Sequence, residues 1–519
     1  MKPIQYGWRK RSLSARLISF TALCALSLTI MIYGSGNCQA QSGTGWVPGA
    51  ISHALRMPHD PNAERTQQIT PPIIPLISND RDPSGQIGSL NAGGPTVTAT
   101  NGFFENLGSN GRTCFSCHQP ANGWGISAAS VQQTFFESSG QAPVFRPVDG
   151  AVCPTADVST LPARAKAYSL LLRRGLIRIG LPVPAGAEFA FTSVADPYGC
   201  NTNPATGLIS PSSGTVSVYR RPLPSTNLGF LNAIMWDGRE PSLQSQVADA
   251  TSIHAQAAAP PSTALINQIV AFESAQQTAQ SQDDAAGKLN ASGATGGPDG
   301  LTVTLAAFFA GINDPLGGNP KGTPFTSVIF TLYDSWAKAA SFDHLFGRLA
   351  VLRGQALFNT KPIAITGVNG LNDTLGVPTI RGFCGTCHDS PNVGNHSVKL
   401  PLNIGIANAG PFNATTGTGT APGLDVSGLP VFTISCVSGP NQGTTYTVTD
   451  PGRALISGKC ADIGKVKGPI LRGLAGRAPY FHNGSGANLE DVVTFYDKRF
   501  GIGFTDQEKS DLVAFLKTL

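Results

Sequence analysis

The stretch Cys114-Phe115-Ser116-Cys117-His118 determines how this chain is organised, and a second copy follows as Cys384-Gly385-Thr386-Cys387-His388. Each copy has the C-x-x-C-H spacing that is typical of c-type haem attachment. Two thiols three positions apart can add to the two vinyl groups of one haem, and the adjacent His can reach the iron as its proximal ligand. We therefore predict two covalently bound c-type haems, attached at Cys114, Cys117, Cys384 and Cys387 and ligated by His118 and His388.

Two other chemistries also use Cys pairs at this spacing. A four-thiolate zinc site joining the two motifs would leave both following histidines without a role. A dithiol oxidoreductase is expected to carry its motif in a βαβ pattern, and no such pattern surrounds either copy. Haem attachment is therefore the better interpretation of both motifs.

The N-terminus has the pattern of an export signal. Basic residues up to Arg16 precede an apolar stretch over residues 17–33, and cleavage after Ala40 fits the small-residue rule. We expect a signal peptide over residues 1–40 and a periplasmic mature protein. An uncleaved membrane anchor is the alternative, because the apolar stretch is long for a signal.

The cysteines agree with an oxidising compartment. Cys24 and Cys38 fall in the predicted signal, and four more belong to the haem motifs, so that an even number remains. Four cysteines allow three disulfide pairings. We favour Cys153–Cys200 and Cys436–Cys460, because each pair would staple one Gly/Pro-rich insertion.

Length and composition favour two haem domains with long loops. The chain has 519 residues, enough for two or three domains, and its 60 Gly and 39 Pro favour ordered loops over regular sheets. A net charge of +5 with only 13% charged residues indicates no nucleic-acid partner. We expect a mainly α fold of two cytochrome c-like haem domains with loop-rich insertions. The expected segments are an extended arm over 41–100, an N-terminal haem domain over 101–341 with an insertion over 127–216, and a C-terminal haem domain over 342–519 with an insertion over 401–460.

Helical periodicity is clear in four places. Ser262 or Thr263 can cap a helix that extends to Gln280, and Asn488 and Thr505 can cap the last two helices. The predicted inward-facing residues are Leu265, Ile266, Ile269 and Phe272 in the first helix; Leu345, Leu349, Leu352 and Ala356 in the second; Leu489, Val492, Val493 and Tyr496 in the third; and Leu512, Phe515, Leu516 and Leu519 in the last.

Beyond the haem motifs, three short stretches resemble the bacterial di-haem cytochrome c peroxidases and their relatives of the MauG type. They are MWDGR at residues 235–239, KGPILR at 467–472 and APYFHNG at 478–484, and the final helix also matches. The resemblance covers residues 101–124, 222–280, 342–388 and 466–519, with the motifs in the family's order. The insertions lie outside it.

The resemblance implies two cytochrome c folds with separate tasks. The N-terminal haem would react with peroxide, and the C-terminal haem would handle electrons. In the family a Trp lies between the two haems, and Trp236 falls at that position. Without the resemblance, Trp236 would be interpreted as a core aromatic residue.

The chain departs from the peroxidases in its predicted peroxide pocket. The family's distal His ligand is missing, because no His occurs between His118 and His254. The first haem would then be five-coordinate and open, as in the MauG type. Gln246 matches the family's distal Gln, but Gln256 replaces its distal Glu, and an amide cannot shuttle protons as a carboxylate does. His254 can substitute, since its ordinary pKa suits proton transfer near neutral pH; alternatively it is a surface residue and the pocket is weak.

The sixth ligand of the second haem also departs from the peroxidases. They carry a Met in the helix after the Tyr-Phe-His motif, whereas the MauG type carries a Tyr, and this chain has Tyr496 there. A phenolate ligand stabilises ferric iron and lowers the reduction potential relative to Met. The alternative is a buried helix residue with a hydrogen-bonded hydroxyl. His396 and His482 are rival ligands.

The resemblance therefore implies an exported di-haem peroxidase. It would reduce hydrogen peroxide with electrons from a small cytochrome or a cupredoxin. One alternative is a MauG-like oxidase of a protein substrate, and another is a non-enzymatic di-haem electron carrier, which the missing distal Glu favours. A homodimer and a calcium ion between the domains stay open, because the family's Asn calcium ligand before the Trp has no clear match here.

Overall fold

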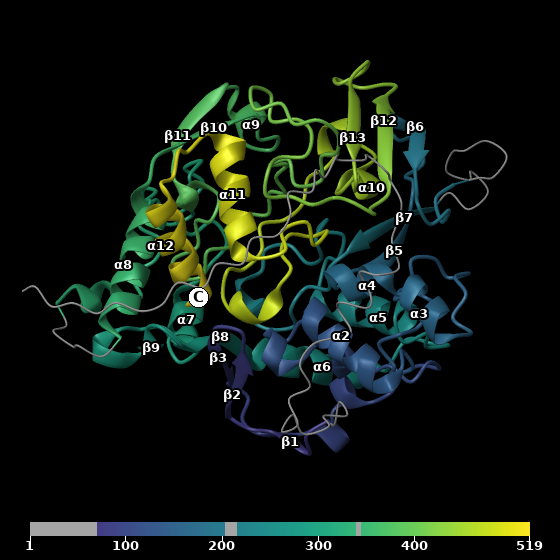
Figure 1. The fold of residues 1–519 in the computed structure, drawn as a ribbon, viewed down its shortest axis with the longest axis horizontal. Helices are drawn as coiled ribbons and strands as arrows, with labels where there is room; N and C mark the ends of the chain where they lie inside the picture. Colours follow the sequence, from purple (N-terminus) through teal and green to yellow (C-terminus); the bar gives the residue numbers. More distant parts are fainter. Residues whose placement is uncertain (1–69, 203–214, 339–343) are drawn as a thin grey trace, which may run out of the picture. The chain divides into compact units, whose positions relative to one another are not determined.

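A computed structural model describes residues 70–202, 215–338 and 344–519 (Figure 1). The predicted signal peptide and residues 41–69 of the predicted arm lie outside these ranges. Of the described residues, 31% are helical and 18% lie in strands or bridges. The expectation of a mainly α fold is therefore wrong, because segments both inside and outside the family resemblance form several small sheets instead of loops.

The helices and strands alternate along the chain without a single dominant layer. The helices are α2 (Ala128–Ser138), α3 (Leu161–Ala167), α4 (Ser169–Arg174), α5 (Leu243–Ile253), α6 (Thr263–Ala275), α7 (Leu301–Ala307), α8 (Leu345–Thr360), α9 (Asn372–Leu375), α10 (Ala454–Ser457), α11 (Leu489–Phe500) and α12 (Asp506–Lys517). The strands are β1 (Ile73–Ile74), β2 (Ile77–Asp82), β3 (Gly85–Asn91), β4 (Thr96–Val97), β5 (Ile177–Pro182), β6 (Phe189–Ala195), β7 (Thr215–Arg220), β8 (Gln276–Asp283), β9 (Gly287–Lys288), β10 (Ile363–Thr366), β11 (Thr379–Gly382), β12 (Val431–Cys436) and β13 (Thr445–Val448).

The two insertions form one shared sheet. Strand β6 of the N-terminal insertion pairs antiparallel with β12 of the C-terminal insertion, and β12 pairs in turn with β13 (Figure 1). Buried and half-buried side chains alternate along β12, with Phe432 and Ile434 fully buried. These two residues pack in one apolar cluster with Val216 and Val218 of β7. Both insertions therefore contribute to a common β core.

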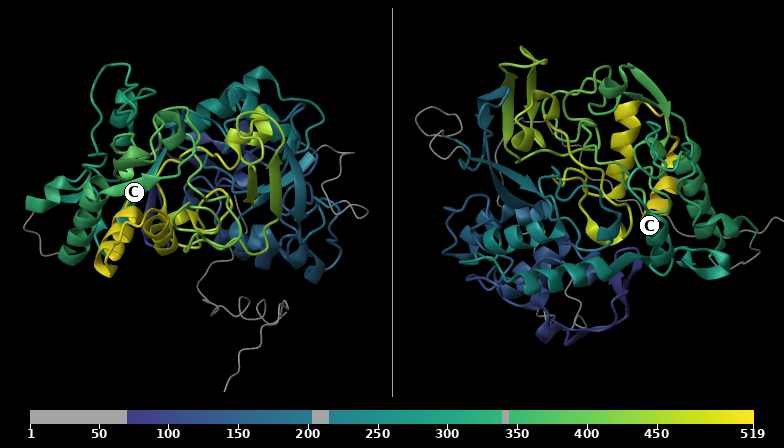
Figure 2. Two further views of the ribbon diagram at one scale, coloured as in Figure 1. Left: turned by 90° about the horizontal axis from the view of Figure 1, so that it is seen from above. Right: turned by 180° about the vertical axis from the view of Figure 1, so that it is seen from behind.

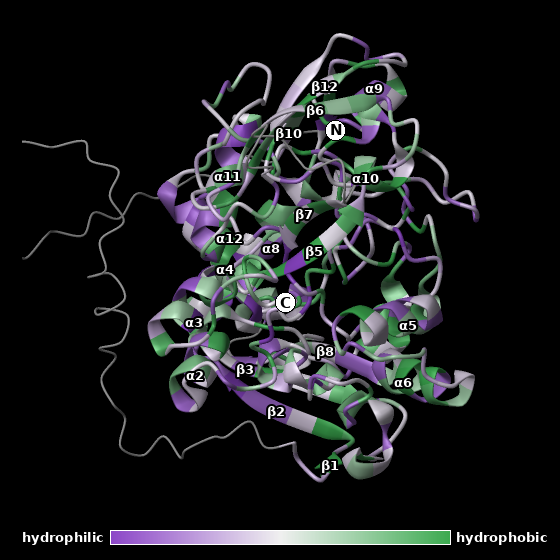
Figure 3. Ribbon diagram, turned by 90° about the vertical axis from the view of Figure 1, so that its right-hand side faces the viewer, coloured by the Kyte–Doolittle hydropathy of each residue, from purple (hydrophilic) through white to green (hydrophobic). Residues whose placement is uncertain are grey.

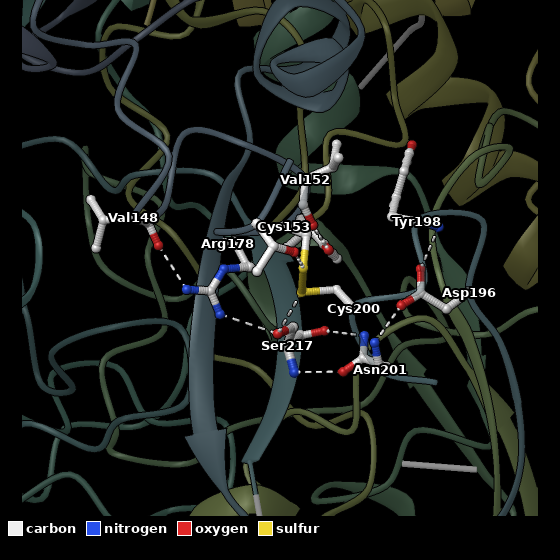
Figure 4. Close-up of a disulfide and its surroundings, with 11 residues drawn as sticks. Val148, Val152, Cys153, Arg178, Asp196, Tyr198, Cys200, Asn201 and Ser217 are labelled. Carbon is white, nitrogen blue, oxygen red and sulfur yellow. Dashed lines mark hydrogen bonds between the residues drawn. A yellow bond between two sulfur atoms is a disulfide. The ribbon is translucent and has the colours of Figure 1, made fainter. Parts of the chain in front are cut away.

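The structure confirms both predicted disulfides. Cys153 and Cys200 are joined with their Cα atoms 5.4 Å apart, and Cys436 and Cys460 with theirs 5.9 Å apart. Next to the first disulfide, the Asn201 amide exchanges two hydrogen bonds with the backbone of Ser217 (Figure 4). The disulfide thereby ties the loop before α3 to strand β7.

The described part of the predicted arm is hydrogen-bonded into a sheet. Strands β2 and β3 form a hairpin, and β3 pairs with β8 in the order β2-β3-β8-β9. The outer strand β2 is hydrophilic over most of its length (Figure 3). Helix α6 is capped by Ser262 as predicted, but it ends at Ala275 and not at Gln280. The following residues leave the helix because they form β8, where Thr278 and Gln280 are buried.

The last helix packs against the helix that precedes the second haem motif. In Figure 2 the yellow α12 lies beside the green α8, and α11 contacts α12 in turn. Asn488 caps α11, and Thr505 and Glu508 form the predicted capping box of α12. The inward face predicted for α8 is wrong, because Leu349 and Ala356 are exposed and Val351 and Phe358 are buried.

A glycine allows α8 and α12 to approach each other closely. A Cβ atom added at Gly354 would lie only 2.0 Å from the carbonyl oxygen of Asp511 in α12. The two helix backbones approach so closely that only a residue without a side chain fits between them.

Within residues 70–202, 215–338 and 344–519, no helix combines the length and apolarity that a membrane crossing requires.

We predict that each disulfide stabilises the protein against unfolding. The bridges join residues 47 and 24 positions apart. Because each bridge restricts the unfolded chain, the two should raise the free energy of unfolding by about 4 and about 3.5 kcal/mol. Replacing Cys153 and Cys200 by Ala should lower the thermal unfolding midpoint more than the same change at Cys436 and Cys460. Calorimetry of both double variants measures the difference, and midpoints equal to the parent's would contradict it.

Candidate functional site

The two haem motifs fold in the same way. Each starts with a short 3-10 turn, and the amide of each motif His donates to the carbonyl of the first motif Cys. The ring Nδ1 of His118 is 2.9 Å from the carbonyl oxygen of Trp124, and that of His388 is 2.7 Å from the carbonyl oxygen of Gly394. Each carbonyl belongs to the sixth residue after its His. In both copies this contact leaves Nε2 as the nitrogen that is free to bind a metal.

The four motif thiols suit haem attachment better than zinc binding. All four are free of disulfide bonds, and burial raises the pKa of each thiol above the ordinary value. No three His, Cys, Asp or Glu side chains in the described ranges come together as a metal site. The two motifs therefore do not join into the four-thiolate site of the zinc alternative.

A large cavity lies at the first motif. Its empty space is about 1350 Å³, part of it open to solvent, and Cys114, Cys117 and His118 line it. Three of the four predicted catalytic residues line the same cavity: Trp236, Gln246 and His254. Gln256 does not. Its backbone has a left-handed φ of 56°, and its exposed amide oxygen accepts a hydrogen bond from Asn110 instead.

Helix α5 presents one face to this cavity. Ser242 caps the helix by accepting a hydrogen bond from the amide of Ser245. Gln246, Ala250 and His254 follow at steps of four residues, which places them on one side of the helix, and all three line the cavity. A polar amide, a small methyl group and an imidazole therefore follow one another along the cavity wall.

His254 is held by a residue that the sequence did not suggest. Its Nδ1 lies 2.5 Å from Oδ2 of Asp149, and the other carboxylate oxygen of Asp149 binds the guanidinium of Arg112. Asp149 belongs to the N-terminal insertion, and all three side chains line the cavity. The insertion contains no recognisable motif at Asp149, so only the folded structure could reveal this contact.

Two buried cations on the cavity wall have no carboxylate partner. Arg221 donates only to backbone carbonyls, and neither Arg221 nor Lys467 forms an ion pair with any described residue. Burial lowers the pKa of Arg221 to about 9 and that of Lys467 to about 7. Buried charges are normally paired, so this wall is suited to an anionic group such as the carboxylates of a haem. Together with the two thiols and His118, the residues present fit haem.

At the second motif, a tyrosine lies against the predicted iron ligand. The Tyr496 hydroxyl is 3.5 Å from Nε2 of His388, and the two rings meet edge to face. Burial lowers the pKa of His388 to about 4, so its ring is neutral and can act as a ligand. Burial also raises the pKa of the Tyr496 phenol. The residues here, two thiols, a neutral imidazole and a facing phenol, also fit haem.

The two rival ligands face other partners. The Nδ1 atom of His396 is 3.1 Å from Oδ2 of Asp389. His482 is fully buried, with its ring 6.1 Å from that of Trp236 and its Nε2 atom 3.6 Å from Oδ2 of Asp450. Tyr496 is therefore the predicted residue whose polar atom meets Nε2 of His388.

Trp236 connects the two parts of the site. It lines the first cavity, and it also packs in an apolar cluster with Phe495 and Tyr496 of α11. Its indole nitrogen donates to the carbonyl of Arg221 at 2.8 Å. The residue is only 8% exposed, which is the burial expected of a core aromatic residue.

Beside Trp236, one arginine joins two carboxylates. Arg220 lies 2.5 Å from Oδ2 of Asp237 and makes a two-pronged contact with Asp450, at 2.6 and 2.9 Å. Side-chain exposure is 2% or less at all three residues. Asp450 lies in the C-terminal insertion, so the ion pairs connect that insertion to the segment of Trp236.

The turns before α5 and α11 are copies of each other. Met235 and Phe481 have left-handed φ values of 66° and 67°, and each is followed by a helix with a side-chain cap. Trp236 and His482 occupy the same place in the two turns. At the same distance along the chain from these turns, α5 carries Ala250 and α11 carries Tyr496. The first site therefore has a methyl group where the second has a phenol.

Sequence similarity to known proteins is confined to parts of the chain. Two cytochrome-c peroxidases of Denitromonas iodatirespirans are 44% identical over 89 residues and 42% identical over 151 residues, which are 15% and 27% of this chain. A cytochrome c551 peroxidase of Nitrosomonas europaea is 34% identical over 99 residues, or 17% of this chain. The chain is a relative of the cytochrome-c peroxidases. The family resemblance inferred from the motifs is thereby confirmed.

The matches cover 24% and 37% of the two Denitromonas peroxidases and 30% of the Nitrosomonas peroxidase, so the chain spans well under half the length of each of these relatives. No protein-family model matches the chain. The crystal structure of a MauG-like protein associated with microbial copper homeostasis aligns with 59% of this chain and 75% of its own. Its TM-score is 0.28 at 20% identity, and no argument rests on it.

We predict that Arg220 is required for stability. Replacing Arg220 by Met leaves Asp450 buried without its main partner, which should lower the free energy of unfolding by about 3–5 kcal/mol. Arg81→Ala is the control, because Arg81 pairs with Asp284 where both side chains are more than half exposed, and about 0–1 kcal/mol is expected. Denaturant unfolding of both variants measures the two costs. Equal effects would contradict the prediction.

Proposed function

We propose that this protein is an exported di-haem enzyme that reduces hydrogen peroxide at the first motif with electrons from an external donor protein. The observation that carries the proposal is the face of α5, which brings Gln246, Ala250 and His254 to the cavity of His118. The second motif contacts the phenol of Tyr496, whereas the corresponding position on α5 is Ala250, which lines the first cavity. A small substrate can therefore enter the first site, whereas the second is closed by Tyr496.

The residues of the chain would divide the work as follows. Cys114, Cys117 and His118 would hold a haem, which supplies the two-electron redox chemistry when bound. His254 accepts a proton from one oxygen of the peroxide and returns it to the other, the general acid-base task that the amide of Gln256 cannot perform. Gln246 donates a hydrogen bond from its amide to the substrate. One peroxide, two protons and two electrons give two waters.

The second motif would receive electrons and pass them on. Cys384, Cys387 and His388 would hold the second haem, with Tyr496 as the sixth ligand. Trp236 would lie between the two haems, a role that its contacts with the first cavity and with α11 support. The two disulfides support export to an oxidising compartment such as the periplasm.

Tyr496 also favours a second candidate function. A phenol ligand stabilises iron in its higher oxidation states, which suits an enzyme that stores oxidising equivalents and then oxidises a protein substrate, as in the MauG type. The contact of 3.5 Å between the Tyr496 hydroxyl and Nε2 of His388 is the observation behind this alternative. The two functions differ in the source of the electrons, which is a donor protein in one and the modified substrate in the other.

We predict that the purified protein carries two haems and consumes peroxide. Its intact mass should exceed that of the processed polypeptide by two haem masses, and two equivalents of a reduced small cytochrome should be oxidised for each peroxide. Replacing Cys114 and Cys117 by Ala should remove one haem and abolish the peroxide reaction. The same change at Cys384 and Cys387 should instead block oxidation of the donor. A parent protein with one haem or none, or with no peroxide consumption, would refute the proposal.

We predict that Tyr496 ligates the second haem. Tyr496→Phe should convert a low-spin ferric signal to a high-spin one in the EPR spectrum, and Tyr496→Met should raise the reduction potential. Tyr446→Phe is the control, since Tyr446 lies in β13 of the insertion and its hydroxyl only accepts a hydrogen bond from Asn441. A low-spin spectrum that persists in Tyr496→Phe would assign the ligand to another residue, with His396 or His482 next.

A further inference from the structure

We propose that Asp149, supplied by the N-terminal insertion, is the positioning residue of the peroxide pocket and holds the ring of His254 so that its Nε2 atom faces the cavity. This inference rests on the proposed function of the cavity. It adds a residue outside every motif that resembles the peroxidases. It also assigns a role to the insertion, which the resemblance does not cover.

The first argument is the geometry of the His254 ring. Nδ1 of His254 lies 2.5 Å from Oδ2 of Asp149, whose side chain is 2% exposed. A carboxylate only accepts hydrogen bonds, so the proton of the neutral ring is on Nδ1 and the lone pair is on Nε2. Among the described residues, Nε2 of His254 has no hydrogen-bond partner, and the side chain lines the cavity. The ring is thus held ready to accept a proton from a ligand in the cavity.

The second argument is that Asp149 stays charged. Burial alone would raise the pKa of Asp149, but the charge of Arg112 and the bond to His254 outweigh it, and the pKa lies below its ordinary value. Arg112 is itself fixed, because it donates to the carbonyls of Pro143 and Val144 at 2.9 and 2.7 Å. The carboxylate therefore has one oxygen for Arg112 and the other for His254.

The third argument is the rigidity of the loop that carries Asp149. Arg178 of β5 donates from its backbone amide to the carbonyl of Asp149 and from its guanidinium to the carbonyl of Val148, both at 2.7 Å. The Cys153–Cys200 disulfide follows four residues later and ties the same loop to the region of β7 (Figure 4). Strand, disulfide and arginine together keep the carboxylate at one place, as a positioning residue requires.

The proposal also explains how the pocket works without the family's distal Glu. Gln256, at the corresponding position, is turned away from the cavity and bonded to Asn110. His254 faces the cavity two residues earlier and is oriented by a carboxylate from a distant part of the chain. The proton acceptor and its carboxylate are thus two separate residues, one on α5 and one on the insertion.

The test uses the full-length holoprotein and two rates. One is the reaction with hydrogen peroxide. The other is cyanide binding to the ferric protein, which involves no turnover but requires hydrogen cyanide to lose its proton in the pocket. His254→Ala should slow both rates by about 10²–10⁴-fold, as expected for loss of a general base. Asp149→Asn should slow both by about 10–100-fold, as for other residues that orient a functional His. In the His254→Ala background, Asp149→Asn should have no further effect.

Matched variants separate positioning from folding. Asp157→Asn removes an exposed carboxylate of the same insertion and should match the parent in both rates. Should Asp149→Asn not fold, Asp149→Asn with Arg112→Gln removes both charges of the buried pair and leaves none unpaired. Haem content and the unfolding midpoint are measured for each variant.

The outcomes distinguish this inference from the proposed function. Parental rates in Asp149→Asn, with slow rates in His254→Ala, would overturn the positioning role of Asp149 and leave the peroxidase proposal intact. Parental rates in His254→Ala would overturn the role of His254 itself. A low-spin first haem in the parent that becomes high-spin in His254→Ala would identify His254 as an iron ligand, and would overturn the inference as well.

Discussion

The ion pairs of Arg220 with Asp237 and Asp450 are the contact on which the arrangement of the site depends. Removing three charges from water is costly, and the cost is offset only because each carboxylate meets the guanidinium at hydrogen-bond distance. Arg220 ends strand β7, Asp450 belongs to the C-terminal insertion, and Asp237 follows Trp236. One side chain thus connects β7 and the C-terminal insertion to the segment of the tryptophan at the cavity.

Around this contact, the two halves of the chain share the same local backbone structure but differ in the side chains that it carries. Each has a C-x-x-C-H turn whose His contacts a carbonyl six residues later, and each has a capped helix after a left-handed turn. The difference lies in what the helix presents. Helix α5 presents the small Ala250 followed by His254, and α11 presents Tyr496 followed by Phe500, which stacks on the tyrosine ring. A few different side chains on one helix face thus give the two proposed haem sites different surroundings.

The parts of this structure that could be predicted from the sequence are those encoded locally. The haem motifs, the cap at Asn488 and the capping box of Thr505 depend on residues a few positions apart. The disulfides were predictable because four cysteines remained and each correct pair staples one insertion. Strand β12 also had a local signal, since Val431, Thr433 and Ser435 alternate with large apolar residues, but the abundance of Gly and Pro favoured loops. Sheets formed by distant segments explain why the expected mainly α fold was wrong.

The contact of Asp149 with His254 joins residues 105 positions apart, and no pattern in either segment indicates it. The position of the Gln256 side chain could not be predicted from the sequence either. The match of Gln256 to the family's Glu predicted a side chain in the pocket, whereas its left-handed backbone and its bond to Asn110 place the side chain elsewhere.

The pairing of β6 with β12 has a consequence for the order of assembly. These strands are separated by more than two hundred residues of chain, and Lys467, which lines the first cavity, is made later still. Contacts of such long range form late in folding, because the intervening chain must first be ordered. The first motif therefore leaves the ribosome, and crosses any membrane on its way, long before Lys467 is available to complete the wall of its cavity. During that interval a haem can reach Cys114 and Cys117 from the side. The segment of Lys467 then completes the wall around a group that would already be in place, so the cavity would form around its contents and would not be filled afterwards.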